Sequence, residues 1–133
     1  MSNLKLLVID DSRLIHALFG TIFAPKRREI DLRFAFHGRE AMALLELHGE
    51  PDIIFLDVNM GIMSGIEFLT AVAPTKLAER VPIIVVSTED TEEDVARARD
   101  LGARDYVRKP FTPRDIVLAL ERHVSWPQKV GGA

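Results

Sequence analysis

Three short runs of consecutive apolar residues constrain the fold of this chain more than any other feature of its sequence. They occupy residues 6–9, 53–56 and 83–86. A strand that is covered on both faces has no polar side, so such runs are typical of the central strands of a parallel sheet. Segments with helical periodicity separate the runs. The pattern therefore predicts an α/β fold, in which strands and helices alternate.

Two further strands complete the predicted sheet. Residues 30–37 alternate between apolar and polar side chains, which indicates an edge strand, and residues 105–108 form a short last strand. Helices are expected at residues 12–23, from Gly38, from about Ser64, at 91–101 and at 112–124, with a loop at 74–81. Five strands, each followed by a helix, favour a doubly wound five-stranded parallel sheet with five helices. We adopt the flavodoxin-like strand order 2-1-3-4-5 by analogy.

The expected first helix carries an apolar stripe that should face the sheet. Its members are Leu14, Ile15, Leu18, Phe19 and Ile22. The histidines of the chain share no spacing that favours a metal site, so we expect them on helical or loop surfaces. They are His16, His37, His48 and His123.

Composition excludes several classes of protein. The chain has 133 residues, of which 47% are hydrophobic and 28% charged, as in an ordinary globular domain. Its net charge of −3 gives no basic surface for nucleic acid, and the absence of cysteine excludes disulfides and thiolate chemistry. The first apolar run is too short for a signal peptide, and no stretch reaches the roughly 18 apolar residues of a membrane span. We therefore expect a soluble, cytoplasmic protein, with one domain at residues 1–124 and a disordered tail at 125–133.

Chemically useful side chains stand where the predicted strands end. They are Asp10 and Asp11 after the first strand, Asp57 and Asn59 after the third, Ser87 after the fourth and Lys109 after the fifth. The carboxyl ends of parallel strands meet at one edge of the sheet, where α/β proteins bind their ligands. Adjacent carboxylates repel each other unless a cation compensates them. A capping role for Asp11 or Ser12 would leave Asp10 unexplained, so the converging carboxylates favour a hard cation such as Mg²⁺.

Four sequence blocks, VIDDS, LDVNM, VSTE and YVRKPF, resemble in order and spacing the signature of the response-regulator receiver domain. The resemblance covers the chain up to about Val124. It implies that Asp57 is the phosphoacceptor. It also implies that Mg²⁺ is bound by Asp10, Asp11, Asp57 and the backbone carbonyl of Asn59.

The same resemblance gives roles to residues of the last two strands. Lys109 would pair with the phosphoryl oxygens, Ser87 would move toward the phosphoryl group, and Tyr106 would be an aromatic switch. Lys109-Pro110 matches the cis peptide of the family. Two positions depart from the usual pattern, because Gly61 replaces a common proline and Thr88 is bulkier than the small residue frequent there. The first should loosen the loop after Asp57, and the second could restrict access of water.

The function implied is that of a phosphorylation-dependent receiver in a two-component system. Asp57 would take a phosphoryl group from a histidine kinase or a histidine phosphotransfer protein, and the domain would catalyse only its own phosphorylation and dephosphorylation. The signal would pass on by altered binding of a downstream protein or of a second copy. We expect the output surface on the last two helices and the strand between them, which contains Tyr106. In the last helix, Val117 and Leu118 are apolar beyond the inward stripe of Ile116, Ala119 and Leu120.

Two other classes of protein remain as alternatives. A haloacid-dehalogenase-like phosphohydrolase also combines a nucleophilic aspartate, a hydroxyl, a lysine and Mg²⁺. It normally has an acid two residues after the nucleophile, and Asn59 at that position cannot act as a general acid. A flavodoxin-like cofactor binder would need a phosphate-binding loop after the first strand, which this sequence does not show.

Overall fold

The computed structural model describes residues 3–88 and 91–125. Within them the strands are β1 (Leu4–Ile9), β2 (Ile30–Ala35), β3 (Ile53–Leu56), β4 (Ile83–Ser87) and β5 (Asp105–Arg108). The helices are α1 (Arg13–Phe23), α2 (Gly38–His48), α3 (Gly65–Val72), α4 (Leu77–Arg80), α5 (Glu92–Asp100) and α6 (Pro113–His123). Two short 3-10 helices, η1 (Ala24–Lys26) and η2 (Ala73–Thr75), follow α1 and α3. Most of the predicted tail lies outside the described residues.

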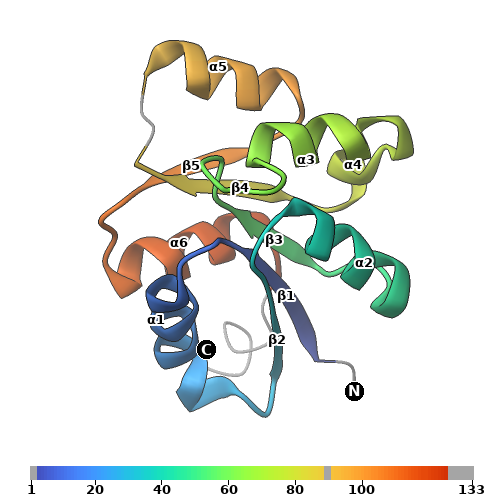
Figure 1. Cartoon of the computed structure of the whole chain (residues 1–133). Coiled ribbons are helices and arrows are strands. Elements are labelled where there is room, and N and C mark those ends of the chain that lie inside the picture. The colour runs from blue at the N-terminus through green and yellow to red at the C-terminus, as the bar shows by residue number, and fades with distance from the viewer. Residues whose placement is uncertain (1–2, 89–90, 126–133) are drawn as a thin grey trace.

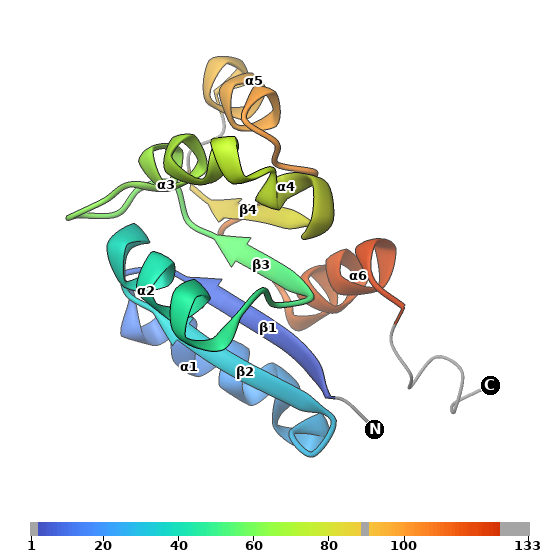
Figure 2. The same ribbon diagram turned by 90° about the vertical axis from the view of Figure 1, so that its right-hand side faces the viewer.

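All five strands are parallel and follow the order β2-β1-β3-β4-β5, which confirms the predicted fold class. The edge position of β2 is also confirmed, and Ile9 at the end of β1 pairs with Ala35 on one side and Leu56 on the other. Figure 1 and Figure 2 show α1 and α6 on one face of the sheet and α2, α3, α4 and α5 on the other. Each helix of the described residues is shorter or more polar than a membrane crossing requires.

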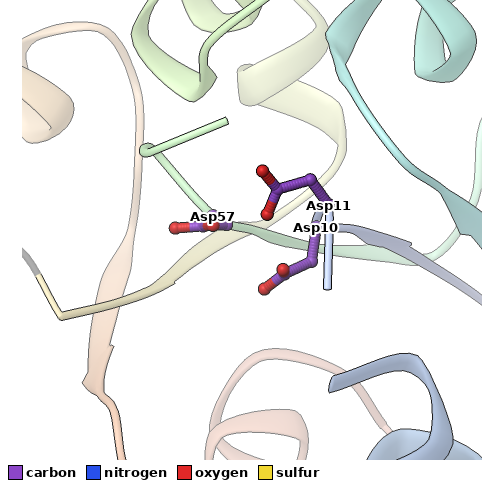
Figure 3. A group of neighbouring side chains, drawn as sticks. All are labelled: Asp10, Asp11 and Asp57. Carbon is purple, nitrogen blue, oxygen red and sulfur yellow. The ribbon is translucent and has the colours of Figure 1, made fainter. Parts of the chain in front are cut away.

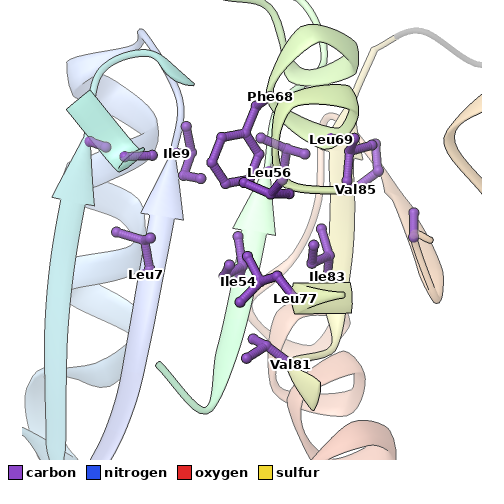
Figure 4. Close-up of a cluster of buried hydrophobic side chains, with 14 of the residues drawn as sticks. Leu7, Ile9, Ile54, Leu56, Phe68, Leu69, Leu77, Val81, Ile83 and Val85 are labelled. Atoms are coloured by element: carbon purple, nitrogen blue, oxygen red, sulfur yellow. The ribbon is translucent and has the colours of Figure 1, made fainter. Parts of the chain in front are cut away.

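Two apolar clusters cover the faces of the sheet and explain why its central strands are continuously apolar. Alternate residues of β1, β3 and β4 meet Phe68 and Leu69 of α3, and Leu77 of α4, on one face (Figure 4). The intervening residues meet Phe19 of α1 and Ile116 of α6 on the other. Burial on both faces fixes the register of the strands, because a slip by one residue would exchange the two sets.

The predicted loop at residues 74–81 is wrong in part, since residues 77–80 form α4. Leu77 is buried against the sheet, and burial of an apolar side chain favours a local structure that directs it inward. Arg80 then fixes the end of the helix, because it donates hydrogen bonds to the Glu50 carboxylate and to the carbonyl oxygen of Thr75 at 3.0 Å.

The packing of α1 also differs from the prediction. Leu14 and Leu18 are 68% and 39% exposed, whereas His16, Phe19 and Phe23 are buried. The reason lies in aromatic contacts: the ring of Phe19 lies 5.1 Å from that of Phe55, and His16 stacks on Phe34 at 4.6 Å. These contacts turn the helix so that His16 faces the sheet. The expected surface position of His16 is therefore wrong.

Helix α5 contrasts with the others because it buries very little. Among its nine residues, all of which the structure describes, only Ala98 is buried. Its first turn is acidic and its last turn contains Arg97 and Arg99, so its charges complement the helix dipole. It stops before Gly102, whose φ of 112° is readily adopted only by glycine.

Candidate functional site

Three carboxylates meet at the carboxyl ends of β1 and β3. The backbone N–H of Asp10 donates to Ala35 at 3.0 Å and that of Asp57 to Ile9 at 2.9 Å, so the sheet hydrogen bonds continue past both strands. This pairing holds Asp10 and Asp57 at the edge of the sheet, and Asp11 follows directly. One oxygen from each of the three carboxylates lies within 4.8 Å of the others (Figure 3). Asp10 and Asp57 are buried, whereas Asp11 is exposed.

Both oxygens of Asp10 already have hydrogen-bond donors. Its Oδ1 accepts from the backbone N–H of Ser12 at 2.9 Å, and its Oδ2 accepts from Lys109 Nζ at 2.8 Å. The exposed Asp11 has room to face a hydrated ion. Of this adjacent pair, Asp11 is therefore better placed than Asp10 to hold a cation directly, and Asp10 would act through water.

Lys109 connects the acids of β1 and β3 to the end of β5. Its Nζ lies 3.6 Å from Asp57 Oδ2, farther than from Asp10, and its side chain is 16% exposed. Its backbone N–H donates to the carbonyl oxygen of Ser87 at 3.0 Å, which sets the position of the lysine relative to β4. The Lys109-Pro110 peptide is cis, as expected. The structure thus brings together the residues that the sequence placed at four separate strand ends.

The surroundings of Asp57 raise the pKa of its carboxyl group. Burial raises its pKa, and the charge of Asp10 adds to this effect. Three groups oppose the rise: the backbone N–H of Asn59, which donates to Oδ1 at 3.1 Å, the Lys109 ammonium and the Ser87 hydroxyl. Because the net shift is upward, ionised Asp57 is unfavourable in the metal-free fold, and a cation would remove this cost.

We expect Asp57→Asn to stabilise the metal-free protein. Because the pKa of Asp57 is raised in the folded protein, folding favours the protonated carboxyl group. The stability from this preference is present below about pH 4 and is lost as the pH rises through the raised pKa and the group ionises. The uncharged amide does not titrate, so the variant should gain about 1 kcal/mol at neutral pH and little in acid. Urea unfolding in chelator at about pH 7 and about pH 4 measures both differences. Equal stability of the two proteins at neutral pH would contradict the claim that the ionised Asp57 carboxylate destabilises the metal-free fold.

Gly65 is a site residue that sequence reasoning missed. It begins α3 and packs so closely on the end of β3 that a Cβ there would collide with the backbone of Asp57 and Val58. Its N–H donates to the carbonyl oxygen of Val58 at 3.1 Å. The available signal was its position directly after Ser64, which caps α3 in a capping box with Glu67.

Tyr106 lies beside the site rather than in it. It pairs with Val85 on β4, two residues before the end of that strand, and packs partly buried against the apolar cluster below α3. Its hydroxyl oxygen is buried. The structure therefore places Tyr106 near Ser87 in the sheet, as a switch role requires, but the role itself stays a prediction.

The donor set fits Mg²⁺ by its chemistry. Mg²⁺ prefers oxygen ligands, is held by few carboxylates and keeps several of its waters. Asp57 is buried and Asp11 exposed, so the cluster offers carboxylate oxygens on one side and solvent on the other.

Comparison with known proteins agrees with this geometry. Residues 6–121 match the family model of the response regulator receiver domain. The chain belongs to this family. It is a receiver domain of two-component signalling, and the match extends over most of its length.

Similar proteins come from several bacteria. The chain is 35% identical over 118 residues to a chemotaxis protein CheY homolog of Campylobacter jejuni, an alignment that covers 89% of this chain and 90% of that protein. It is also 35% identical to the transcriptional regulatory protein PdtaR of Mycobacterium tuberculosis, over 91% of this chain and 57% of that protein. The crystallised chemotaxis protein CheY4 of Vibrio cholerae superposes with a TM-score of 0.83 at 30% identity, and covers 92% of this chain and 100% of its own.

Proposed function

We propose that this receiver domain accepts a phosphoryl group on Asp57 from a histidine kinase or a histidine phosphotransfer protein. The observation that carries the proposal is the position of Asp57, which is buried beside Lys109 and within hydrogen-bond reach of Ser87 and the Asn59 N–H. A solvated surface carboxylate would have no such surroundings. Mg²⁺, held by Asp11, Asp57 and the Asn59 carbonyl and by Asp10 through water, would neutralise charge on the transferred group.

The residues of the site have separate roles in this reaction. An Asp57 oxygen attacks phosphorus, the P–O bond to aspartate forms, and the bond between phosphorus and the donor nitrogen breaks. Lys109 moves part of its interaction from Asp10 to the phosphoryl oxygens, and Ser87 donates a hydrogen bond to one of them. Because phosphoryl transfer depends mainly on positioning and charge neutralisation, these groups are sufficient for a domain that phosphorylates itself.

A small phosphodonor tests this function. With Mg²⁺ and acetyl phosphate, the protein should gain a single acid-stable, base-labile phosphoryl group, measured by intact mass. The alternative phosphohydrolase would instead release phosphate from phosphate esters over many turnovers. Asn59 argues against it, because an amide two residues after the nucleophile cannot serve as general acid. Many turnovers on an ester, without a stable phosphoprotein, would favour the hydrolase.

The proposed output surface is a groove beside Tyr106. Its volume is about 330 Å³, and Tyr106, Arg108, Asp115, Leu118 and Arg122 are among the residues that line it. Leu118 is 37% exposed, whereas Val117 is partly buried against the apolar cluster of α1 and α6. Of these two residues, Leu118 is therefore the more exposed. We propose that phosphorylation changes this groove, so that it binds a downstream protein or a second copy of the chain.

We expect Leu118→Asp to weaken binding of the activated protein about tenfold, because it removes the exposed aliphatic side chain of the groove and places a charge that must be desolvated in the contact. Light scattering with beryllofluoride and Mg²⁺ measures self-association, and a pull-down measures capture of other proteins. Leu47→Asp is the matched control, since Leu47 is 75% exposed on α2, away from the groove.

The result also decides where to search next. If Leu118→Asp and Leu47→Asp behave alike in both assays, the output surface lies elsewhere. The next candidate is the outer face of α1, where Leu14 and Leu18 are exposed near Asp11. His16, which is buried, does not belong to that face.

A further inference from the structure

The connection between β2 and α2 contains an uncommon helix cap. His37 is the N-cap residue of α2, and its Nδ1 accepts a hydrogen bond from the backbone N–H of Glu40 at 3.2 Å. The Glu40 carboxylate in turn accepts a hydrogen bond from the backbone N–H of Phe36 at 2.6 Å. Together these bonds fix the backbone that leads from the edge strand into the helix. Serine, threonine, aspartate or asparagine usually caps a helix, and histidine can do so only while Nδ1 carries no proton.

Gly38, the residue after this cap, contacts the loop that follows Asp57. The backbone N–H of Gly38 donates to the carbonyl oxygen of Met63 at 3.1 Å. A Cβ on Gly38 would lie 2.7 Å from Cγ and Sδ of Met63, so the methionine side chain lies directly on the glycine. Met63 belongs to residues 58–64, which connect β3 to α3 and which we name the acceptor loop. The cap and the acceptor loop are thus joined through one glycine.

The acceptor loop needs such a restraint. Around Gly61 there is open space and Ile62 is 69% exposed, so residues 61–62 have little packing, whereas Met60 before them is buried. At its start, the backbone N–H of Asn59 donates to Asp57 Oδ1 at 3.1 Å. A shift of the loop at Met63 would therefore displace Asn59 and change its hydrogen bond to the Asp57 carboxylate.

We propose that neutral His37 is a positioning residue for the phosphorylation of Asp57, and that its protonation releases the acceptor loop. The inference rests on the proposed function of Asp57. A protonated Nδ1 is a donor and cannot accept from the Glu40 N–H. The added positive charge also stands at the positive end of the helix dipole of α2. Both effects weaken the cap when His37 is protonated.

Other charged groups near this connection must be separated from His37. The acceptor loop itself contains no titratable side chain. The groups on the adjoining elements are Arg39 and Glu40 on α2, Arg13 and His16 on α1, Asp11 after β1, and Glu67 on α3, which accepts a hydrogen bond from the Ser64 N–H. Glu40 would partly offset the charge of a protonated His37. His16 contacts the ring of Phe36 at 4.5 Å, and its buried Nε2 has no hydrogen-bond partner among the described residues.

Two substitutions at position 37 test the proposal. Asparagine caps through its side-chain oxygen at any pH, whereas alanine does not cap. We expect wild type and His37→Asn to be phosphorylated by acetyl phosphate with Mg²⁺ at the same rate at about pH 8, and His37→Ala about fivefold more slowly. Between about pH 8 and pH 5.5 the wild-type rate should fall about fivefold relative to that of His37→Asn. Since both proteins retain His16, a pH effect common to them belongs to other groups or to the donor.

The outcomes distinguish the cap from the phosphorylation site. Identical pH profiles for wild type and His37→Asn, or a wild-type rate for His37→Ala at about pH 8, would overturn the proposal. Nuclear magnetic resonance of the unphosphorylated proteins provides a second measurement. The amide signals of Gly38 and Glu40 should shift together with pH in wild type and not in His37→Asn. If these signals shift with pH as expected but none of the proteins is phosphorylated, the proposed function of Asp57 is wrong, whereas the pH-dependent cap at His37 is supported.

Discussion

Asp57→Asn should abolish phosphoryl labelling of the protein by acetyl phosphate with Mg²⁺. The amide is a poor nucleophile, and the proposal places the attacking oxygen on Asp57, which is buried beside Lys109 and Ser87. We expect labelling to fall at least a hundredfold, measured by intact mass under conditions that fully label wild type (~3 kcal/mol in the barrier).

A matched variant tests whether the loss of labelling is specific to Asp57 or follows from removing any carboxylate. Asp100→Asn removes an exposed carboxylate at the end of α5 and should label like wild type. Unfolding does not explain a loss in Asp57→Asn, because we expect that variant to be more stable without metal. Labelling of Asp57→Asn at the wild-type level would remove Asp57 from its proposed role.

Asp11→Asn should weaken Mg²⁺ binding more than any other single substitution that leaves Asp57 in place. Asp11 is exposed, so its carboxylate is available as a direct ligand. Removing one anionic ligand from a hard cation should raise the Kd at least tenfold, which is about 1.4 kcal/mol. Asp10→Asn should have a smaller effect, because both Asp10 oxygens already accept hydrogen bonds.

Calorimetry is the suitable measurement of Mg²⁺ binding, since the single tryptophan, Trp126, lies outside the described residues. Asp100→Asn again provides the control. Equal affinity of wild type, Asp11→Asn and Asp10→Asn for Mg²⁺ would mean that the acidic pair has another purpose. A larger loss in Asp10→Asn than in Asp11→Asn would show instead that Asp10 is the direct ligand.

The sheet was predictable because its signals are local. Runs such as residues 53–56 have no polar side and therefore belong in the centre, and the alternation of residues 30–37 places β2 at an edge. The packing of the helices was less predictable. Leu14 and His16 exchanged their expected environments because aromatic contacts with Phe34 and Phe55 turn α1, and periodicity alone does not encode those contacts.

The candidate site was predictable for the same topological reason. Parallel strands bring their carboxyl ends together, so Asp10, Asp57 and Lys109 had to converge once the strand order was known. Sequence did not indicate that Lys109 lies closer to Asp10 than to Asp57. It also did not indicate the cap at His37, because both depend on side-chain conformations that follow only from the packed structure.

The sparse burial of α5 has a consequence for its local stability. Hydrophobic burial supplies most of the free energy that keeps a helix folded in water, and α5 has only Ala98 for this purpose within the described residues. Its amides should therefore exchange with solvent through local opening well below the free energy of global unfolding. A segment of this kind can change conformation while the sheet stays intact. The free energy needed to rearrange α5 then depends on the few contacts of this helix, and not on the stability of the whole domain.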